Sequence, residues 1–178
     1  IRLNEARFVR AHNAYEVQHF AHIKNSLDRV HVIEIDLSFS KIPRRSRKSI
    51  YVSHGKSYDE NNCGPKGNGG LKTCLLDIKN WHEKNTGHDF KIIVINIKAF
   101  IAKTLRGRKI VFEQMLQNIQ EVFPRILLYT PKDRKGDYED MRTALLKSPW
   151  PMLGELKGKF MFTLNVGPVA DRGRTLNQ

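Results

Sequence analysis

The sequence predicts an α/β domain with a parallel sheet, and three observations support this fold class. Short apolar runs alternate with segments of helical periodicity, as they do in chains built from βαβ units. The run Phe90–Phe100 is almost continuously aliphatic, which is typical of a parallel strand buried on both faces. Polar residues that a core would reject stand at the carboxyl ends of the strand-like runs, where barrels and open α/β sheets place their active sites.

Periodicity and turn residues define the elements of the first half. An apolar run predicts a strand over residues 6–12, and apolar residues near helical spacing predict a helix over Glu16–Leu27. Two more strands, His31–Phe39 and Ser49–Ser53, are expected on either side of a basic loop that contains proline. Segment Asp59–Gly70 has four glycines and three asparagines, so a loop is expected there.

The second half continues this alternation. One apolar stripe predicts a helix over Leu71–Lys84, and a second predicts a helix over Lys109–Phe123 that Pro124 ends. Shorter patterns predict the strands Arg125–Pro131 and Phe160–Val166 and the helix Tyr138–Ser148. With Phe90–Phe100 these segments bring the number of expected strands to six, and no internal repeat is present.

Composition limits the class of protein. The chain has 178 residues, 40% of them hydrophobic, which is enough for a single domain over residues 1–178 with its own core. No run approaches the ~20 apolar residues of a membrane-spanning helix. An excess of 31 lysines and arginines over 18 acidic residues gives a net charge of +13. This charge favours polyanionic partners, but its basic clusters are equally expected in solvated loops.

Two cysteines and two histidines lie within or next to the helix predicted over Leu71–Lys84. Cys63 lies in the glycine-rich loop before it, and Cys74 falls on its apolar face. A disulfide that closes the loop, as in an exported protein, and two free thiols are both compatible with this arrangement. His82 and His88 are expected at an exposed helix end rather than at a metal.

Three short strings carry residues suited to chemistry: VRAHNAY (Val9–Tyr15), VIEIDLS (Val32–Ser38) and YVSHGK (Tyr51–Lys56). The second string places Glu34 and Asp36 at positions i and i+2 of one strand, so both carboxylates project from the same face. Ionised carboxylates in apolar surroundings are costly unless a cation meets them. A divalent metal is one explanation, and an ion pair with a neighbouring arginine or lysine is another.

Two histidines bracket this acidic pair in the sequence. His12 stands near the end of the first string and His54 near the end of the third, and histidine suits proton transfer near neutral pH. A second polar pair at i and i+2, Asn96 and Lys98, stands in the run Phe90–Phe100. Lys98 could bind a phosphate as a point charge, or it could be the salt-bridge partner of the acids and leave the site without metal.

The order AHNAY, VIEIDLS, SHGK resembles the phospholipase-C-like phosphodiesterase superfamily, and above all its calcium-dependent phosphatidylinositol-specific members. The later string SPWPMLGELKGKFMFTL (Ser148–Leu164) is similar to a segment that leads into a later strand of that family, so the resemblance covers about Phe8–Leu164. It implies a distorted TIM (β/α) barrel that cleaves phosphodiesters. Such a barrel usually needs ~250 residues, so we expect an incomplete barrel whose C-terminal strands are missing or divergent.

The same resemblance implies roles for individual residues. His12 and His54 are the expected acid–base pair, and Ca²⁺ (or Mg²⁺) is the expected cofactor because a hard cation neutralises the charge of a phosphodiester. The expected metal ligands are Asn13, Glu34, Asp36 and Asn96. The expected substrate-binding residues are Lys98 and Lys56.

A secondary similarity leaves the substrate open. The triplet Asn96–Ile97–Lys98 stands where eukaryotic phospholipases C supply a glutamate to the metal, and it resembles the Asp-x-Lys of sphingomyelinase D, with asparagine for aspartate. That group also carries a cysteine-bridged loop after its second histidine, much as Cys63 and Cys74 are placed here. The alternatives to phosphatidylinositol are therefore a head-group phosphodiesterase of sphingomyelinase D or glycerophosphodiesterase type, and a non-catalytic module that binds anionic lipid.

The function expected from the sequence is metal-assisted cleavage of phosphatidylinositol or a similar phospholipid, with a cyclic phosphate product. Basic loops would hold the protein on anionic membrane surfaces. A nucleic-acid phosphodiesterase is disfavoured, because the basic runs lack the interleaved aromatic residues that stack on bases. The chain starts at Ile1 without a signal-like segment, so we expect a mature or excised piece of a longer polypeptide. A secreted or delivered protein peripheral to membranes, including a toxin, is compatible with these features.

Overall fold

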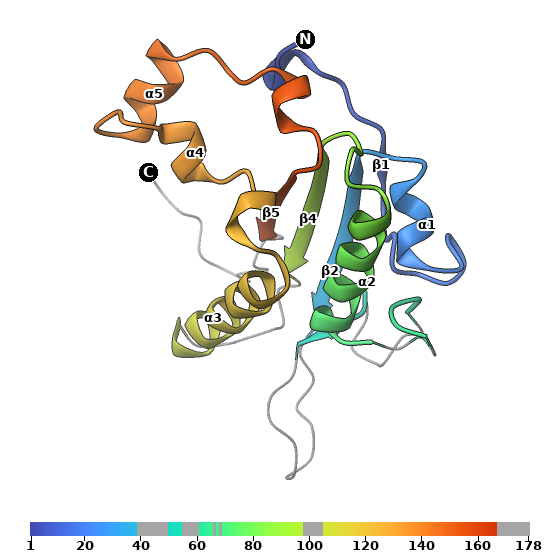
Figure 1. Ribbon diagram of the computed structural model, residues 1–178. Coiled ribbons are helices and arrows are strands. Elements are labelled where there is room, and N and C mark those ends of the chain that lie inside the picture. The colour runs from blue at the N-terminus through green and yellow to red at the C-terminus, as the bar shows by residue number, and fades with distance from the viewer. Residues whose placement is uncertain (39–49, 55–60, 66, 68, 98–104, 167–178) are drawn as a thin grey trace.

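The computed structural model describes residues 1–38, 50–54, 61–65, 67, 69–97 and 105–166 of the chain (Figure 1). Its strands are β1 (Arg10–Ala11), β2 (Val32–Ser38), β3 (Tyr51–Val52), β4 (Lys91–Ile97) and β5 (Phe160–Val166). Its α-helices are α1 (Ile23–Leu27), α2 (Leu71–Lys84), α3 (Leu105–Val122), α4 (Pro131–Lys135) and α5 (Met141–Lys147). Short 3₁₀ helices occupy Leu3–Glu5, Arg125–Leu127 and Leu153–Leu156. None of the described helices is long and apolar enough to cross a membrane.

The strands form one sheet in which parallel pairs dominate. β1, β2, β4 and β5 lie side by side in that order and run parallel, while the short β3 pairs antiparallel with the end of β2. The register sets Asp36 beside Asn96, and Asn96 beside Asn165 of β5. The predicted α/β class is confirmed. Over the described residues the sheet stays unclosed, which agrees with a distorted, incomplete barrel.

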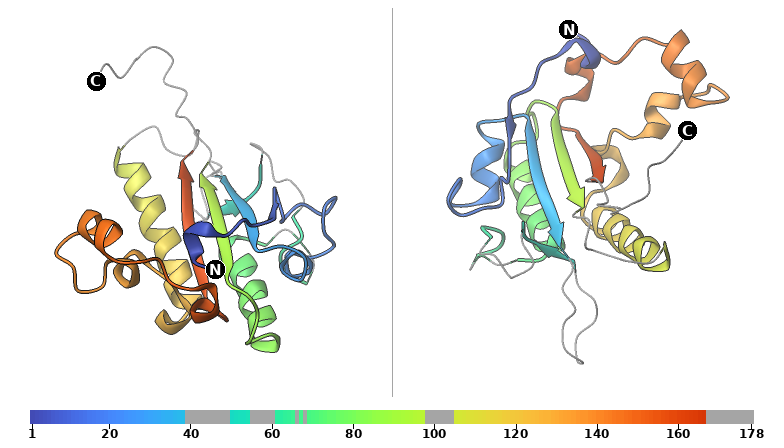
Figure 2. Two further views of the ribbon diagram at one scale, coloured as in Figure 1. Left: turned by 90° about the horizontal axis from the view of Figure 1, so that it is seen from above. Right: turned by 180° about the vertical axis from the view of Figure 1, so that it is seen from behind.

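The two faces of this sheet differ in chemistry. Along β2, Ile33, Ile35 and Leu37 alternate with Glu34 and Asp36, so the aliphatic and acidic side chains point to opposite faces. The aliphatic face packs against the apolar residues of α1, α2 and α3 in the main hydrophobic core. The right-hand view of Figure 2 shows α2 behind β2 when the sheet is seen from its other side. The acidic face therefore corresponds to the inside of a barrel.

A second hydrophobic cluster covers the amino-terminal end of the acidic face. Leu3, Phe90, Tyr129 and Leu156 are buried together there, and the partly buried Ile92 packs against them. Ile92 lies at the start of β4, on the same face as Asn96 because the two are four residues apart on one strand. One end of this face is therefore filled with apolar side chains, and the polar residues gather at the other end.

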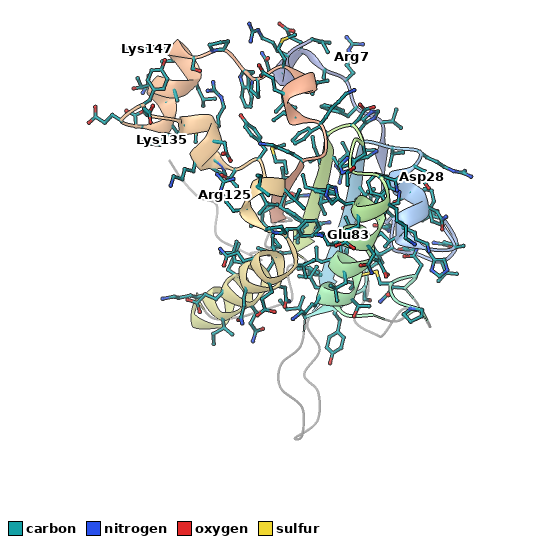
Figure 3. The ribbon with its side chains drawn as sticks, in the orientation of Figure 1. Arg7, Asp28, Glu83, Arg125, Lys135 and Lys147 are labelled. Atoms are coloured by element: carbon teal, nitrogen blue, oxygen red, sulfur yellow. A yellow bond between two sulfur atoms is a disulfide. The ribbon has the colours of Figure 1, made fainter. Side chains whose placement is uncertain are left out.

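Helices α4 and α5 belong to a segment that stands apart from the sheet. The Arg134 side chain holds this segment together, because its Nη2 donates to the carbonyl oxygens of Ala144 at 3.2 Å and Ser148 at 3.0 Å. Its guanidinium lies 4.7 Å from the centre of the Trp150 ring. Figure 3 labels three cations on this segment: Arg125, Lys135 and Lys147. In Figure 1 the segment lies away from the carboxyl ends of β2 and β4.

The helix predicted over Glu16–Leu27 is wrong for most of its length, because only α1 is helical. The Nδ2 atom of Asn62 donates to the carbonyl oxygens of Ala14 at 3.0 Å and Phe20 at 2.8 Å. These carbonyls therefore bond a side chain from a distant loop instead of amides one helical turn further on. Hydrophobic periodicity cannot reveal such a competitor, since Asn62 lies far along the chain.

The strand predicted over Arg125–Pro131 is also wrong. Its first residues form a 3₁₀ turn, a single bridge connects the segment to Phe160, and α4 starts at Pro131. The carboxylate of Asp133 accepts hydrogen bonds from the backbone amide and the hydroxyl of Thr130, both at 2.7 Å. This cap, with proline at the first helical position, starts a helix within an apolar run that resembles a strand.

The other predictions differ from the structure mainly at element boundaries. The helix Leu71–Lys84 and the strand Phe160–Val166 are confirmed at both ends. The third predicted helix begins at Leu105 instead of Lys109, and the first strand is limited to two residues. The remaining predicted elements are shorter in the structure, at Val32–Ser38, Tyr51–Val52, Lys91–Ile97 and Met141–Lys147.

Cys63 and Cys74 form a disulfide. Of the two possibilities that the sequence left open, the disulfide is therefore correct. It fastens the loop that precedes α2 to the helix itself, and both cysteines are fully buried in the main core. Residues 61–63, just before the bridge, are buried as well.

His82 was expected at the surface, and this expectation is wrong, because it is only 6% exposed at the end of α2. Its Nδ1 lies 3.0 Å from Nε2 of His88, and Nδ1 of His88 lies 2.7 Å from the carbonyl oxygen of Asp89. A carbonyl only accepts, so neutral His88 donates from Nδ1 and accepts at Nε2, and His82 donates from Nδ1. Both rings also pack against Phe160.

We expect this histidine pair to make stability depend on pH. Burial is the main cause that lowers the pKa of His82 and of His88 below the ordinary value of 6.5. As pH falls through about 6.5, the unfolded chain binds protons before the folded chain does, so the free energy of unfolding decreases. Urea unfolding at pH 8.0 and pH 5.5 should show this loss, and His82→Gln should reduce it. The exposed control His22→Gln should leave it unchanged; an equal loss in the His82 variant would contradict the prediction.

Candidate active site

Two buried carboxylates form the centre of the candidate site. Glu34 is 2% exposed and Asp36 is 0% exposed. They lie two residues apart on β2, so their Cα atoms are separated by roughly 7 Å on one face of the sheet. The structure thus brings them together on the inner face, as the sequence predicted. Each carboxylate also meets one of the two predicted histidines.

Three polar side chains among the described residues contact Glu34. Nη2 of Arg10 donates to its Oε2 at 2.7 Å, and Nε2 of His12 lies 3.6 Å from the same oxygen. Nδ2 of Asn96 donates to its Oε1 at 3.1 Å. The register explains the first two contacts, because Arg10 pairs with Val32 and His12 comes level with Glu34 two residues later. The sequence prediction did not include Arg10.

Asp36 is held from the other side of the site. The hydroxyl of the fully buried Tyr15 donates to its Oδ2 at 3.0 Å, and Nε2 of His54 lies 3.9 Å from this oxygen. Burial, and next the charge of Asp36, raise the pKa of Tyr15 far above its ordinary value. The phenol therefore stays protonated and serves Asp36 as a fixed donor. Tyr15 is thus a positioning residue for this carboxylate.

The two histidines stand at the entrance to the site. The side chain of His12 is 67% exposed and that of His54 is 54% exposed, whereas the carboxylates beneath them are buried. His12 comes from the turn after β1, and His54 follows β3. Their exposed imidazoles can meet a ligand from solvent while each keeps one nitrogen near a carboxylate. This arrangement suits paired proton transfer.

Asn13 and Asn96 contribute buried amide oxygens. Asn13 adopts a left-handed backbone conformation with φ of 49°, which asparagine tolerates better than most residues, and its Nδ2 donates to Oε1 of Glu16 at 2.8 Å. The Oδ1 atoms of Asn13 and Asn96 are both buried, and neither accepts a hydrogen bond from the described residues. A buried oxygen without a donor costs about 1–3 kcal/mol. Coordination to a cation is one way to satisfy such an oxygen.

These residues fit a calcium ion. Ca²⁺ takes carboxylate and amide oxygens as ligands, and Asn13, Glu34, Asp36 and Asn96 supply that donor set. Within the described ranges no group of three or more His, Cys, Asp or Glu residues gathers at one point. The two asparagine oxygens would therefore be needed to complete the coordination. The third predicted group, Lys98 and Lys56, lies outside the described residues, so its contact with substrate stays a prediction.

A buried asparagine pair links the two histidine-bearing segments. Nδ2 of Asn62 donates to the Ala14 carbonyl next to the His12 turn, and Nδ2 of Asn61 donates to the Val52 carbonyl at 3.0 Å, two residues before His54. Both asparagines immediately precede the Cys63–Cys74 disulfide. The disulfide therefore anchors a brace that fixes the spacing of the two segments. Sequence reasoning assigned these asparagines only to a loop.

We expect Asn62→Ala to lower the free energy of unfolding by about 2 kcal/mol, because it leaves the buried carbonyl of Ala14 and the partly buried carbonyl of Phe20 without this donor. Urea denaturation measures this loss. Asn80→Ala, at an exposed position of α2, is the matched control and should change stability by less than about 0.5 kcal/mol. Equal effects of the two variants would show that the brace does not stabilise the fold.

Three residues of the site were missed from the sequence, and each had a signal. Arg10 stands two residues before His12, so it shares its face. Tyr15 ends the same string, and its hydroxyl is a polar group within a segment that already carried His12 and Asn13. Asn165 of β5 lies level with Asn96, and it follows Thr163 at the i and i+2 spacing that marked Glu34 and Asp36. The row Asp36, Asn96 and Asn165 therefore crosses three adjacent strands on one face.

Comparison with known proteins places these features in a family. Residues 30–175 match the family described as phosphoinositide phospholipase C, Ca²⁺-dependent. A solved structure of the Ca²⁺-dependent phosphatidylinositol-specific phospholipase C from Streptomyces antibioticus is 25% identical, with a TM-score of 0.75, over 96% of this chain and 55% of that chain. No curated protein matches the chain in sequence.

A second solved structure is similar over the same region. The calcium-dependent phosphoinositol-specific phospholipase C from a Gram-negative bacterium, Pseudomonas sp, is 27% identical with a TM-score of 0.73. The match covers 90% of this chain and 57% of that one, so the chain spans little more than half the length of these solved enzymes. The family match covers most of the chain, including Glu34, Asp36 and His54. The chain therefore belongs to the Ca²⁺-dependent phosphoinositide phospholipase C family.

Proposed function

We propose that this protein is a calcium-dependent phosphodiesterase that cleaves phosphatidylinositol, or a similar phospholipid, into diacylglycerol and a cyclic phosphate. One observation carries the proposal. Two buried carboxylates share a face of β2, and each lies within 4 Å of an exposed histidine. Membership in a Ca²⁺-dependent family supports the cation and the substrate class.

The residues of the site have two separate roles, which are metal binding and proton transfer. Asn13, Glu34, Asp36 and Asn96 would hold calcium, which supplies positive charge that neutralises the phosphodiester. A hydroxyl next to the phosphate forms the new P–O bond as the P–O bond to diacylglycerol breaks. One imidazole accepts the hydroxyl proton and the other donates a proton to the diacylglycerol oxygen. The carboxylate near each histidine helps to orient its imidazole, because one ring nitrogen lies within 4 Å of a carboxylate oxygen.

Charge supports a membrane substrate. The net charge of +13 favours association with an anionic lipid surface, where each well-placed basic residue contributes ~1 kcal/mol. The disulfide supports our further proposal that the protein works outside the cytosol, because such bridges persist in oxidising compartments. Secretion or delivery from a cell agrees with both features.

The open sheet favours a second candidate, a lipid-binding module without catalysis. The chain covers 55% of the Streptomyces enzyme, and its sheet is unclosed over the described residues. An open sheet that holds calcium and phosphate would bind anionic lipid even without turnover. Binding and cleavage must therefore be measured separately.

The test uses vesicles of phosphatidylinositol and vesicles of phosphatidylcholine, each with calcium and with chelator. We expect diacylglycerol release from phosphatidylinositol with calcium and none with chelator. Release of the head-group alcohol would instead indicate a phosphodiesterase of sphingomyelinase D type. Vesicle binding without any product would establish the non-catalytic module, and cleavage that persists in chelator would refute the metal role of Glu34 and Asp36.

A further inference from the structure

The strongest ion pair at the site involves a residue that the proposed chemistry does not use. Nη2 of Arg10 donates to Oε2 of Glu34 at 2.7 Å, a short charge-assisted contact. Glu34 is almost fully buried, whereas the side chain of Arg10 is 45% exposed. The partly exposed side chain of Arg10 therefore contacts a carboxylate that is itself buried.

Oε2 of Glu34 is also the oxygen closest to His12, at 3.6 Å. The other oxygen, Oε1, already accepts from Nδ2 of Asn96 at 3.1 Å. Both oxygens of this carboxylate thus have donors, and a calcium ion that uses Glu34 has to share or displace one of them. Of the described residues that contact Glu34, Arg10 alone carries a permanent positive charge, so its contact opposes a cation most strongly.

Arg10 can leave this contact only by moving. A guanidinium keeps its proton at any physiological pH, so deprotonation cannot release the carboxylate. Its long side chain is half exposed and can carry its charge into solvent while its stem stays at the rim. The backbone of Arg10 is fixed, because Arg10 and Ala11 form β1 and pair with Val32 and Ile33 of β2. The movement is confined to a side chain.

We propose that Arg10 is a built-in competitor of calcium. It neutralises Glu34 until calcium displaces it from Oε2, and the strength of this ion pair sets the calcium affinity of the site. This inference rests on the proposed calcium site. Arg10 acts through Glu34, so it is a positioning residue and not a catalytic one.

The two possible roles of Arg10, as a competitor of calcium or as a structural support of Glu34, lead to opposite predictions for calcium binding. If Arg10 only stabilises the fold or holds Glu34 in place for the metal, its removal weakens calcium binding or leaves it unchanged. If Arg10 competes, its removal strengthens calcium binding although the calcium-depleted protein becomes less stable. A gain in affinity together with a loss of stability is a combination that a structural role does not produce.

The experiment titrates CaCl₂ into the full chain by isothermal calorimetry at constant ionic strength. It also records thermal unfolding with calcium and with chelator. Arg10→Met is expected to bind calcium about tenfold more tightly than the unsubstituted protein and to unfold at a lower temperature in chelator. Arg10→Gln keeps a neutral donor to Glu34, so it should fold normally and show the same change to a smaller degree.

Arg7→Met is the matched control. It removes the same charge three residues earlier, and Figure 3 places Arg7 near the amino-terminal ends of the strands, away from the site. This control separates a local effect at Glu34 from the general effect of one fewer positive charge, and its calcium affinity should equal that of the unsubstituted chain.

The outcomes separate failure of the competition by Arg10 from failure of the proposed calcium site. If the unsubstituted chain binds calcium and both Arg10 variants bind it equally or more weakly, the competition is refuted while the proposed calcium site stands. If none of the proteins binds calcium, both the proposed calcium site and the competition are refuted. Calcium binding by the Arg10 variants alone would support both, because the ion pair would then be strong enough to exclude the metal.

Discussion

Replacing His12 or His54 by alanine is expected to lower kcat for phosphatidylinositol cleavage by about 10²- to 10⁴-fold. Each imidazole lies near one buried carboxylate, and the proposed reaction needs one proton acceptor and one proton donor. Because the two residues act in a single proton relay, the double variant should lose little more than either single variant. Initial rates of diacylglycerol release from phosphatidylinositol vesicles measure the effect.

Both histidine side chains are more than half exposed, so their truncation should leave the fold and calcium binding intact. His22→Ala is the matched control, because His22 is an exposed residue that makes no side-chain cap on α1. Its rate should equal that of the unsubstituted chain. Retention of full activity in His12→Ala would remove this histidine from the mechanism, whatever the outcome for His54.

Asp36→Asn is expected to weaken calcium binding by about a hundredfold or more and to abolish measurable cleavage. The substitution keeps the size of the side chain and an oxygen that can accept from Tyr15, but it removes a buried charge that would face the cation. Loss of one partner from a buried charge pair costs about 3–5 kcal/mol, which corresponds to more than a hundredfold. Calcium calorimetry measures the first effect and vesicle hydrolysis the second.

The stability of the Asp36 variant separates this account from a structural one. Asp36 and Glu34 are like charges on one strand face, so neutralising one of them should not lower the unfolding temperature in chelator. Asp137→Asn, at an exposed position, controls for the change in net charge. Unaltered calcium affinity in Asp36→Asn would exclude this carboxylate from the coordination shell.

Sequence reasoning succeeded where local pattern and chemistry coincided. The alternation in VIEIDLS was enough to set Glu34 and Asp36 on the face opposite the aliphatic residues. The order of His12, the acidic pair and His54 also indicated which segments meet at one end of the sheet. Parallel strands share their carboxyl ends, so residues distant in sequence could be placed together before any contact was known.

The failures came from contacts that no local pattern encodes. The side chain of Asn62 donates hydrogen bonds to carbonyl oxygens of the segment after Asn13, and this segment forms turns instead of the expected helix. The cap formed by Thr130 and Asp133 turns an apolar run into the start of α4. His82 looked like a surface residue because its partner, His88, belongs to the following loop.

Arg10 shows the same limit within the site itself. The sequence raised an ion pair as one explanation of Glu34 and Asp36 and named Lys98 as the candidate partner. Lys98 lies outside the described residues, so its pairing stays a prediction; among the described residues Arg10 of the neighbouring strand, a residue type that the sequence had left open, contacts Glu34. The ion pair and the metal are therefore not exclusive alternatives, since Asn13 and Asn96 each have a buried amide oxygen that fits a cation.

Phosphorus NMR of phosphatidylinositol vesicles tests the central claim most directly, because it reports which phosphate ester forms. The account predicts that calcium and the intact chain convert the lipid signal into that of a cyclic inositol phosphate, and that chelator stops the conversion. Appearance of phosphatidic acid, or formation of any phosphate product in chelator, would contradict it.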